Sequence, residues 1–453
     1  MAKRLLKGDF WKSDLNWRLA LGLAVAAMLA LGPVAANGSG AFSRHRKGKA
    51  DEDAPPAKKP FMTASQQAAL TIAVEPLGFY SPGAYYQGQR ESLVSLDFIG
   101  ENRLLFTFRA PGLIHRTGST DEEERHIRAL VLALPQGAVE AETLCTLHDH
   151  ERYLWMLKDG HFLLRDGEDL KQGNATLDLK PMLHFPGPLA WVEMDPTQQF
   201  MVTNSNEPAQ GASRAGEVPS PATSAASMSA GNADSEGPLD VVVRILHRET
   251  GQVMLVSRVR NPVRLPINPD GYLEVLRSSE RDWMLNLNYF TGGSRVLGKL
   301  ESACAPAIQF ISQQEALANT CTNDGGRLMV AFSTDGNRLW DALAAPNQVW
   351  PLLVMAPNGS RLARETLVLT HPIDAFSPLT FDDVQGQLVE VYDAASGKLV
   401  LKAPASPVLD GGGNVAISPS GRRVAVLDAG AIEVYDLPAP AAQGPPAKGR
   451  TVH

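Results

Sequence analysis

Residues 413–440, GNVAISPSGRRVAVLDAGAIEVYDLPAP, decide the fold because they show a structural unit that ends early. Alternating apolar residues and two turn signals, Pro-Ser-Gly at Pro419 and Ala-Gly at Ala429, predict three short strands. The chain after Pro438 is rich in Pro, Ala and Gly and predicts no further strand. The stretch therefore raises the question of where a fourth strand for this sheet comes from.

The same unit recurs earlier in the chain. Val391-Tyr392-Asp393 returns as Val434-Tyr435-Asp436, 43 residues later. A turn of the form x-Pro-x-Gly precedes a strand at Pro269, Pro357 and Pro419, with a looser copy at Pro196. A third series consists of the hairpin glycines Gly251, Gly293, Gly336 and Gly397. Independent marks with one period indicate a stacked repeat, and four strands per unit of this length are typical of a propeller blade.

On these motifs the chain resembles the β-propeller superfamily, in its WD40-like or YVTN-like branch. The resemblance is carried by SPSGRRVAVLDAGAIEVYD from Ser418, by VEVYDAASGKLV from Val389 and by the proline turns, and it covers roughly residues 70–438. No unit has the Gly-His and Trp-Asp pairs of true WD40 repeats, so the subfamily stays open. The resemblance implies a fold and no particular activity.

The sequence predicts an all-β protein with a seven-bladed β-propeller of four-stranded blades. First hairpins are expected near Glu101, Asp159, Thr197, Asp270, Gln314, Asn358 and Ser420. The last blade lacks one strand, and Leu70–Glu75 alternates apolar and polar residues as a half-buried strand does. We expect this N-terminal strand to close the ring, because an unclosed ring leaves exposed sheet edges. An unrelated N-terminal strand beside a frayed C-terminus is the alternative.

Three units exceed the period, and each excess falls between the second and third expected strands. The insertions are 112–125, 205–237 and 370–386. In a propeller such connections emerge on one face, and long loops on a rigid scaffold commonly bind partners. We expect this face to contact a partner through residues in these loops and in the segment entering blade 1: Tyr80, Tyr85, Tyr86, His115, Arg116, Phe376 and Phe381. The alternative is that the aromatic side chains pack their own loops onto the blades.

Residues 1–36 predict a targeting segment. Basic residues precede Leu19–Ala36, which carries no charge and ends in small residues that suit signal peptidase. The same segment is long enough to span a bilayer. A cleaved signal peptide and a single-helix anchor in the inner membrane both remain open, and both place the remaining chain outside the cytoplasm, in the periplasm or secreted.

The expected domain organisation follows from composition. Residues 37–60 form a disordered linker, 61–438 the propeller with the disordered insertion 205–237, and 439–453 a disordered tail. The chain has 42 basic and 49 acidic residues, a net charge of −7. A nucleic-acid partner is not expected, because its binding needs a strongly basic face.

Two of the three cysteines fit the repeat. Cys304 and Cys321 flank an expected hairpin centred on Ser312-Gln313, where they would face each other and could form a disulfide. A one-residue change of register would place them on opposite faces. Cys145 has no expected partner.

Motifs of catalysis and cofactor binding are absent from the sequence: G-x-S-x-G, H-E-x-x-H, a P-loop and C-x-x-C-H. His148 and His150 could point the same way from a strand, but no third metal ligand is evident. We assign no catalytic, cofactor or metal residue and expect no cofactor. The expected function is non-catalytic binding or scaffolding in the cell envelope, with an envelope protein or polysaccharide as partner. The alternative is an enzyme with an axial site, a hydrolase or lyase acting on envelope polysaccharide or glycosides, and a redox propeller is a third possibility.

Overall fold

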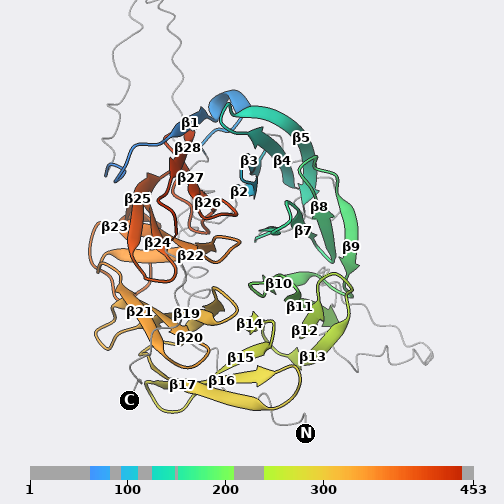
Figure 1. Cartoon of the computed structure of the whole chain (residues 1–453), viewed down its shortest axis with the longest axis vertical. Coiled ribbons are helices and arrows are strands. Elements are labelled where there is room, and N and C mark those ends of the chain that lie inside the picture. Colours follow the sequence, from blue (N-terminus) through green and yellow to red (C-terminus); the bar gives the residue numbers. More distant parts are fainter. Residues whose placement is uncertain (1–61, 82–92, 111–124, 148–151, 209–238, 441–453) are drawn as a thin grey trace, which may run out of the picture.

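A computed structural model describes residues 62–81, 93–110, 125–147, 152–208 and 239–440, which form seven four-stranded antiparallel sheets. Figure 1 shows the sheets arranged around a central axis, with β2, β10, β14 and β26 near the axis and β5, β9, β13 and β17 on the rim. The predicted all-β, seven-bladed propeller is confirmed.

Each blade is named here in chain order, with its strands given from the axis outward. Blade 1 contains β2 (Ser95–Gly100), β3 (Arg103–Arg109), β4 (Arg125–Ala133) and β5 (Ala138–Leu147). Blade 2 contains β6 (Leu154–Met156), β7 (Phe162–Asp166), β8 (Asp169–Gly173) and β9 (Lys180–His184). Blade 3 contains β10 (Leu189–Met194), β11 (Phe200–Pro208), β12 (Leu239–His247) and β13 (Val253–Val259). Blade 4 contains β14 (Ile267–Asn268), β15 (Gly271–Arg277), β16 (Asp282–Tyr289) and β17 (Ser294–Glu301). Blade 5 contains β18 (Ala307–Phe310), β19 (Glu315–Cys321), β20 (Arg327–Ser333) and β21 (Arg338–Leu343). Blade 6 contains β22 (Gln348–Met355), β23 (Arg361–Leu369), β24 (Val384–Asp393) and β25 (Leu399–Ala405). Blade 7 contains β26 (Val415–Ile417), β27 (Arg423–Asp428), β28 (Ala431–Asp436) and β1 (Leu70–Ala73).

The fourth strand of blade 7 comes from the N-terminal side of the propeller. Strand β1 pairs antiparallel with β28, with Leu70 opposite Val434 and Ala73 opposite Ala431. This confirms the predicted ring closure, although the strand ends at Ala73 and the 3-10 helix η1 (Glu75–Leu77) follows. The strand ends at Ala73 because its partner β28 begins opposite it at Ala431, and the N–H of Val74 makes one further hydrogen bond to the turn at Gly430, at 3.0 Å. Closure therefore joins residues more than 350 positions apart, and the ring needs both ends of the propeller sequence.

The apolar core is divided among the blade interfaces. Seven clusters of buried side chains each lie between two neighbouring blades; one contains Ile72, Phe106 and Ile432 between blades 7 and 1, and another contains Val389, Val415 and Tyr435 between blades 6 and 7. Because each sheet is covered on both faces, its central strands read as apolar runs such as RLLFTFR in β3. Each blade is stabilised mainly by its two neighbours.

The periodic glycines of the sequence occupy the turns between third and fourth strands. Gly336 has φ +84 and Gly397 has φ +67, a left-handed conformation that glycine adopts without strain. A Cβ on Gly336 would lie 1.9 Å from the carbonyl oxygen of Leu297 in blade 4, and one on Gly397 would lie 2.6 Å from the Trp340 ring in blade 5. These turns are therefore fixed by contact with the preceding blade as well as by conformation.

Some predicted boundaries need correction. Residues 205–208, assigned to the disordered insertion 205–237, belong to β11, because their neighbours pair in register with β12 as far as Pro208 opposite Leu239. The predicted targeting segment, the linker 37–60 and residues 441–453 of the tail lie outside the described residues. Within the part of the chain that the structure describes, no helix is long and apolar enough to cross a bilayer.

Candidate functional site: the inserted-loop face and the axis

All three long insertions connect the second and third strands of their blades, as the sequence predicted. They join β3 to β4, β11 to β12 and β23 to β24. The first excludes Arg125, which is the buried first residue of β4, and the third ends earlier than expected because β24 begins at Val384. Connections of this type leave a propeller on the same face as the links between successive blades. We call this side the inserted-loop face.

The blade-6 insertion, residues 370–383, is held against blade 5 by one cation. Arg327, the first residue of β20, donates from Nη1 to the carbonyl oxygen of Ile373 at 3.0 Å and from Nη2 to that of Asp374 at 2.9 Å. The backbone adds two hydrogen bonds: Ile373 N–H to Pro346 at 2.9 Å and Ala375 N–H to Gly325 at 3.0 Å. Four hydrogen bonds thus dock the middle of this loop on the neighbouring blade.

The docked loop presents an aromatic side chain to solvent. The Asp374 carboxylate accepts hydrogen bonds from the N–H groups of Phe376 and Ser377 at 2.8 and 2.7 Å, which closes a tight turn. These hydrogen bonds hold the pKa of Asp374 below its usual value. Phe376 lies at the tip of the turn and is 63% exposed. A single exposed apolar side chain is common on protein surfaces, so Phe376 is a candidate contact residue because its loop is docked and not because of its exposure alone.

Tyr80 lies on the same face, in the link from blade 7 to blade 1. The segment turns at Gly78 after η1, and Phe79 packs edge-on against Phe106 and Phe108 with centroids 5.3 Å apart. The next residue, Tyr80, is 64% exposed. The blade-6 loop is docked on blade 5, whereas Tyr80 lies between blades 7 and 1. Phe376 and Tyr80 therefore belong to different parts of the face.

The other residues predicted for this face are only partly described. Phe381 begins the 3-10 helix η2 (Phe381–Asp383), which ends the blade-6 loop. Tyr85, Tyr86, His115 and Arg116 lie outside the described residues, as does the pair His148 and His150. Of the seven predicted contact residues, the structure therefore describes the side-chain exposure of only Tyr80 and Phe376.

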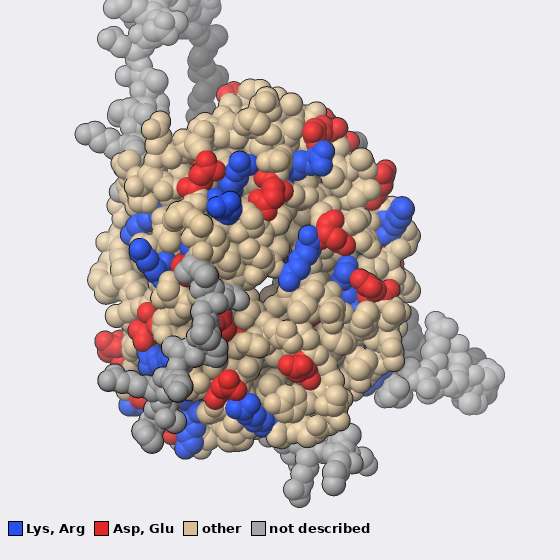
Figure 2. Space-filling view, in the orientation of Figure 1, with Lys and Arg blue, Asp and Glu red and all other residues tan. Residues whose placement is uncertain are grey.

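A group of charged side chains lies at the axis, and no sequence motif predicted it. Asp97 on β2, Glu193 on β10 and Glu365 on β23 all lie in the electrostatic field of Arg152, which precedes β6. Four blades thus contribute one charge each. Figure 2 shows an opening near the middle of the ring, with basic and acidic side chains interspersed over the surrounding face. We call Asp97, Glu193 and Glu365 the axial carboxyls.

Burial is the main influence on the axial carboxyls. It raises the pKa of Asp97 to about 6 and those of Glu193 and Glu365 to about 7, against the opposing effect of their hydrogen-bond donors and of Arg152. Desolvation also lowers the pKa of Arg152, although the residue is exposed to solvent. The positive charge of Arg152 therefore interacts with three carboxyls that are partly protonated near neutral pH.

Each axial carboxyl is already held by its own blade or by the next one. Ser95 Oγ donates to Asp97 at 2.6 Å, and the Trp191 indole N–H donates to Glu193 at 3.4 Å. The N–H groups of Gly413 and Asn414 donate to Glu365 at 3.2 and 2.9 Å. Glu365 is fully buried and so links blade 6 to the entry of blade 7. Of the three, this carboxyl has the clearest structural role.

Among the residues that the structure describes, no three His, Cys, Asp or Glu side chains are arranged to hold a metal ion. Raised carboxyl pKa values at an axis are, however, a feature that acid–base catalysis uses. The sequence signal for Asp97 and Glu193 is a charge inside an innermost strand, as in SLDFIG and LAWVEM, whereas Glu365 lies on the second strand of its blade.

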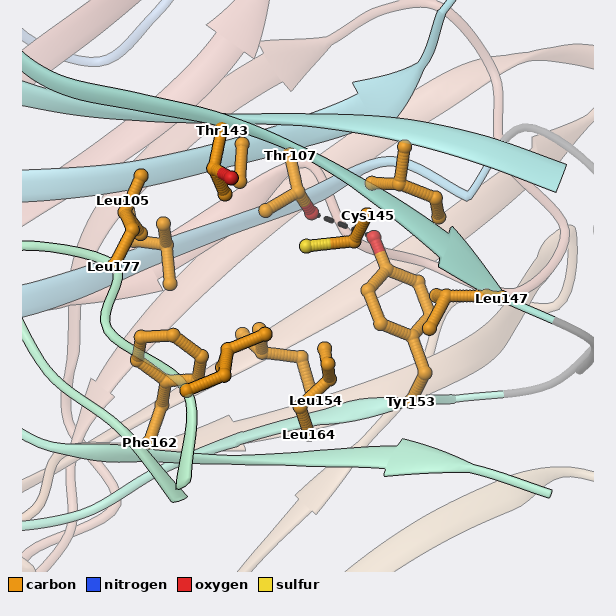
Figure 3. A pocket seen from close by; sticks show the side chains of 13 residues that line it. Leu105, Thr107, Thr143, Cys145, Leu147, Tyr153, Leu154, Phe162, Leu164 and Leu177 are labelled. Carbon is orange, nitrogen blue, oxygen red and sulfur yellow. Dashed lines mark hydrogen bonds between the residues drawn. The ribbon is translucent and has the colours of Figure 1, made fainter. Parts of the chain in front are cut away.

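Cys145, which has no disulfide partner, lines a small cavity between blades 1 and 2. The cavity has a volume of about 10 Å³, room for one water, and its lining is almost wholly apolar. Figure 3 shows the Cys145 side chain pointing into it from β5, near Tyr153, whose hydroxyl lies 2.6 Å from Thr107 Oγ1. Burial raises the pKa of the Cys145 thiol, which keeps it in the unreactive protonated form. This cavity is a packing defect in the core and offers no space for a ligand.

Cys304 and Cys321 are joined by a disulfide, with 5.4 Å between their Cα atoms. Cys321 is the last residue of β19, and Cys304 precedes its partner strand β18, where Ala307 lies opposite Asn319. Ser302 Oγ accepts the N–H of Cys321 at 3.1 Å beside the bridge. The bond closes the first hairpin of blade 5 at its open end.

Comparison with known proteins finds likeness only to solved structures of low sequence identity. No family model and no curated protein matches the chain. The chain is a β-propeller. Among solved structures it is similar to an acylaminoacyl peptidase of Pyrococcus horikoshii, at 9% identity and a TM-score of 0.44, over 77% of this chain and 52% of that one. This propeller thus spans about half the length of the peptidase chain.

Two further solved structures match the propeller over most of both chains. A chain of the mitotic checkpoint complex is 11% identical, with a TM-score of 0.42, over 87% of this chain and 98% of that one. The hydrazine synthase of Kuenenia stuttgartiensis is 9% identical, with a TM-score of 0.41, over 79% and 99%. A fold by itself does not assign an activity.

Proposed function

We propose that this protein is a non-catalytic binding or scaffold module of the cell envelope, and that its inserted-loop face holds an envelope protein or polysaccharide. The observation that carries the proposal is the docked blade-6 loop, which keeps Phe376 63% exposed while four hydrogen bonds fix the loop behind it. A fixed aromatic side chain loses little conformational entropy on binding, which favours affinity.

An extracytoplasmic location is supported by two independent features. Residues 1–36 have the pattern of a signal peptide or an N-terminal anchor. The disulfide between Cys304 and Cys321 suits an oxidising compartment, since structural disulfides are rare in the cytosol. Fusion of residues 1–60 to a reporter enzyme that is active only after export tests this part of the proposal. Retention of the reporter in the cytoplasm would contradict it.

The binding proposal is tested by crosslinking capture from envelope extract with matched variants. Phe376→Ala removes the exposed ring, and Val296→Ala removes a side chain of similar exposure, 57%, near the start of β17 and away from the inserted-loop face. We expect a partner that is captured by the wild type and by Val296→Ala but lost with Phe376→Ala. Equal capture by all three forms would refute a role for this face. The same three forms are then tested on envelope polysaccharides.

An axial enzyme is the second candidate, and the raised pKa values of the axial carboxyls favour it. A general acid needs a carboxyl that is still protonated near neutral pH, as Glu193 is with a pKa of about 7. Glu193 also faces solvent partly, whereas Glu365 is fully buried. Turnover of a glycoside panel that is abolished in Glu193→Gln would establish this function in place of binding alone.

A further inference from the structure

The rim of the propeller consists of seven outermost strands, which are sheet edges with unpaired backbone N–H and C=O groups. Such edges pair with other chains unless charge, proline, short length or a covering segment prevents it. Four of the strands carry charges spread along their length: β5 (Glu140, Glu142), β9 (Lys180, His184), β17 (Arg295, Lys299, Glu301) and β21 (Arg338, Asp341). β1 has only four residues.

The outer edge of blade 6 is covered instead. The N–H of Ser65 donates to the carbonyl oxygen of Lys402 on β25 at 2.7 Å, and Ser65 Oγ accepts the N–H of Lys402 at 2.9 Å. The segment before β1 therefore occupies this edge on its way to close blade 7. Six of the seven outer strands have an identifiable protection.

β13 of blade 3 is the exception. Its residues Val253–Ser257 carry no charge and no proline, and Arg258 near the end is its only ionised side chain. Val253, Met254 and Val256 are 46, 45 and 57% exposed, and no other outer strand exposes three large apolar side chains among the described residues. A bulge at Met254 does not protect it specifically, because blades 1 to 6 all have a register shift between their third and fourth strands.

A groove lies next to this edge. Met254 and Leu255 form one side, and Tyr272, Tyr289 and Phe290 of blade 4 form the other, with an open volume of about 270 Å³. Asn288 also lines the groove, which therefore offers the side chains of an added strand both polar and apolar surface. Edge and groove together form a surface that a single extended strand could cover.

We propose that β13 is a self-association edge, at which two copies of this chain pair antiparallel across a twofold axis. A twofold interface uses the same surface on both copies, so each must offer an unprotected edge, and β13 is the described outer strand that does. Main-chain hydrogen bonds would extend each four-stranded blade into one continuous eight-stranded sheet.

Charge favours a second copy over a charged peptide. Arg258 is already neutralised within its own chain by Glu207 and Asp240, at 3.8 and 3.7 Å. Antiparallel pairing centred in Val253–Ser257 places the two Arg258 side chains at opposite ends of the new sheet, so like charges do not meet. Since the chain carries a net charge of −7, two copies approach most easily along an uncharged strip.

The test measures molar mass by size-exclusion chromatography with light scattering on the full chain as the cell processes it. Val256→Lys places a charge on the β13 edge, and Val296→Lys is the matched control because Val296 on β17 is also 57% exposed. We expect the wild type and Val296→Lys to have twice the chain mass and Val256→Lys to have the mass of one chain. A monomeric wild type, or a dimeric Val256→Lys, would overturn the proposal.

A crosslinking arm guards against a folding defect in the lysine variant. Val256→Cys and Val296→Cys are each made with Cys145→Ser and treated with a short bifunctional thiol reagent. Pairing at β13 predicts a covalent dimer for Val256→Cys alone. A dimer formed equally by both variants, or by neither, would show that copies do not meet at this edge.

Discussion

Removal of the Arg327 guanidinium should free the blade-6 loop without unfolding the propeller. Arg327→Ala deletes the hydrogen bonds to Ile373 and Asp374, at 3.0 and 2.9 Å. A hydrogen bond to a charged group contributes about 1.5 kcal/mol at the lower end of its range, which suits this half-buried side chain. Loss of both should lower the free energy of loop opening by ~3 kcal/mol.

Amide hydrogen exchange measures this opening directly. Each 1.4 kcal/mol changes an equilibrium tenfold, so exchange of the Ile373 and Ala375 amides should become roughly 150-fold faster in Arg327→Ala. Both amides donate to neighbouring segments in the docked loop, at 2.9 and 3.0 Å. Amides of the β23 and β24 ladder should keep their exchange rates.

The matched control is Arg338→Ala in the same blade. Arg338 forms an exposed ion pair with Asp341, which contributes little to stability. Unchanged exchange of Ile373 and Ala375 in Arg327→Ala would refute the assigned clamp, as would equal acceleration in both variants. If the proposed binding function holds, Arg327→Ala should also weaken partner capture while Phe376 is still present.

Three further outcomes are expected. Replacement of both Cys304 and Cys321 by Ala should lower the free energy of unfolding in urea by about 3 kcal/mol, because the bond closes a loop with a sequence separation of 17; an unchanged midpoint would contradict this. Burial raises the pKa of Glu365 to about 7 from the ordinary glutamate value of 4.5. The stabilising effect of its protonated form is therefore complete below pH 4.5 and is lost as the pH rises through 7. Glu365→Gln should remove a fall in stability on the order of 3 kcal/mol over that interval, and an identical pH profile in both proteins would disprove the assignment. Gly336→Ala should destabilise the protein by on the order of 2 kcal/mol more than Gly430→Ala. The two glycines have nearly the same φ, +84 and +80, but only a Cβ at position 336 would clash with a neighbouring blade. Equal melting temperatures of the two variants would show that the structure relieves the clash.

The periodic turns made the fold predictable from the sequence. Pro269, Pro357 and Pro419 mark turns between first and second strands, and Gly336 and Gly397 mark turns between third and fourth strands. These residues act locally: proline fixes φ, and glycine adopts the left-handed conformation. Because the signals have one period, they also fixed the strand lettering and therefore the face from which the insertions leave.

The axial carboxyls could not be found in the same way. Asp97, Glu193 and Glu365 occur in different blades at unrelated positions within their strands, so no linear spacing connects them. Only ring closure brings four blades to one axis and adds Arg152 to the group. Their raised pKa values are likewise a result of burial, which a sequence does not specify.

The sequence by itself determined the number of blades, the strand order, the closing strand and the face that carries the insertions, because these depend on local turn chemistry and on periodic apolar residues. Only the tertiary structure decided that Arg327 docks the blade-6 loop on blade 5, that four blades bring their charges to the axis, and that β13 is left with an uncharged exposed edge. These features depend on which blades become neighbours and on what covers each edge. Such contacts arise between residues far apart in the chain, where local conformational preference carries no information.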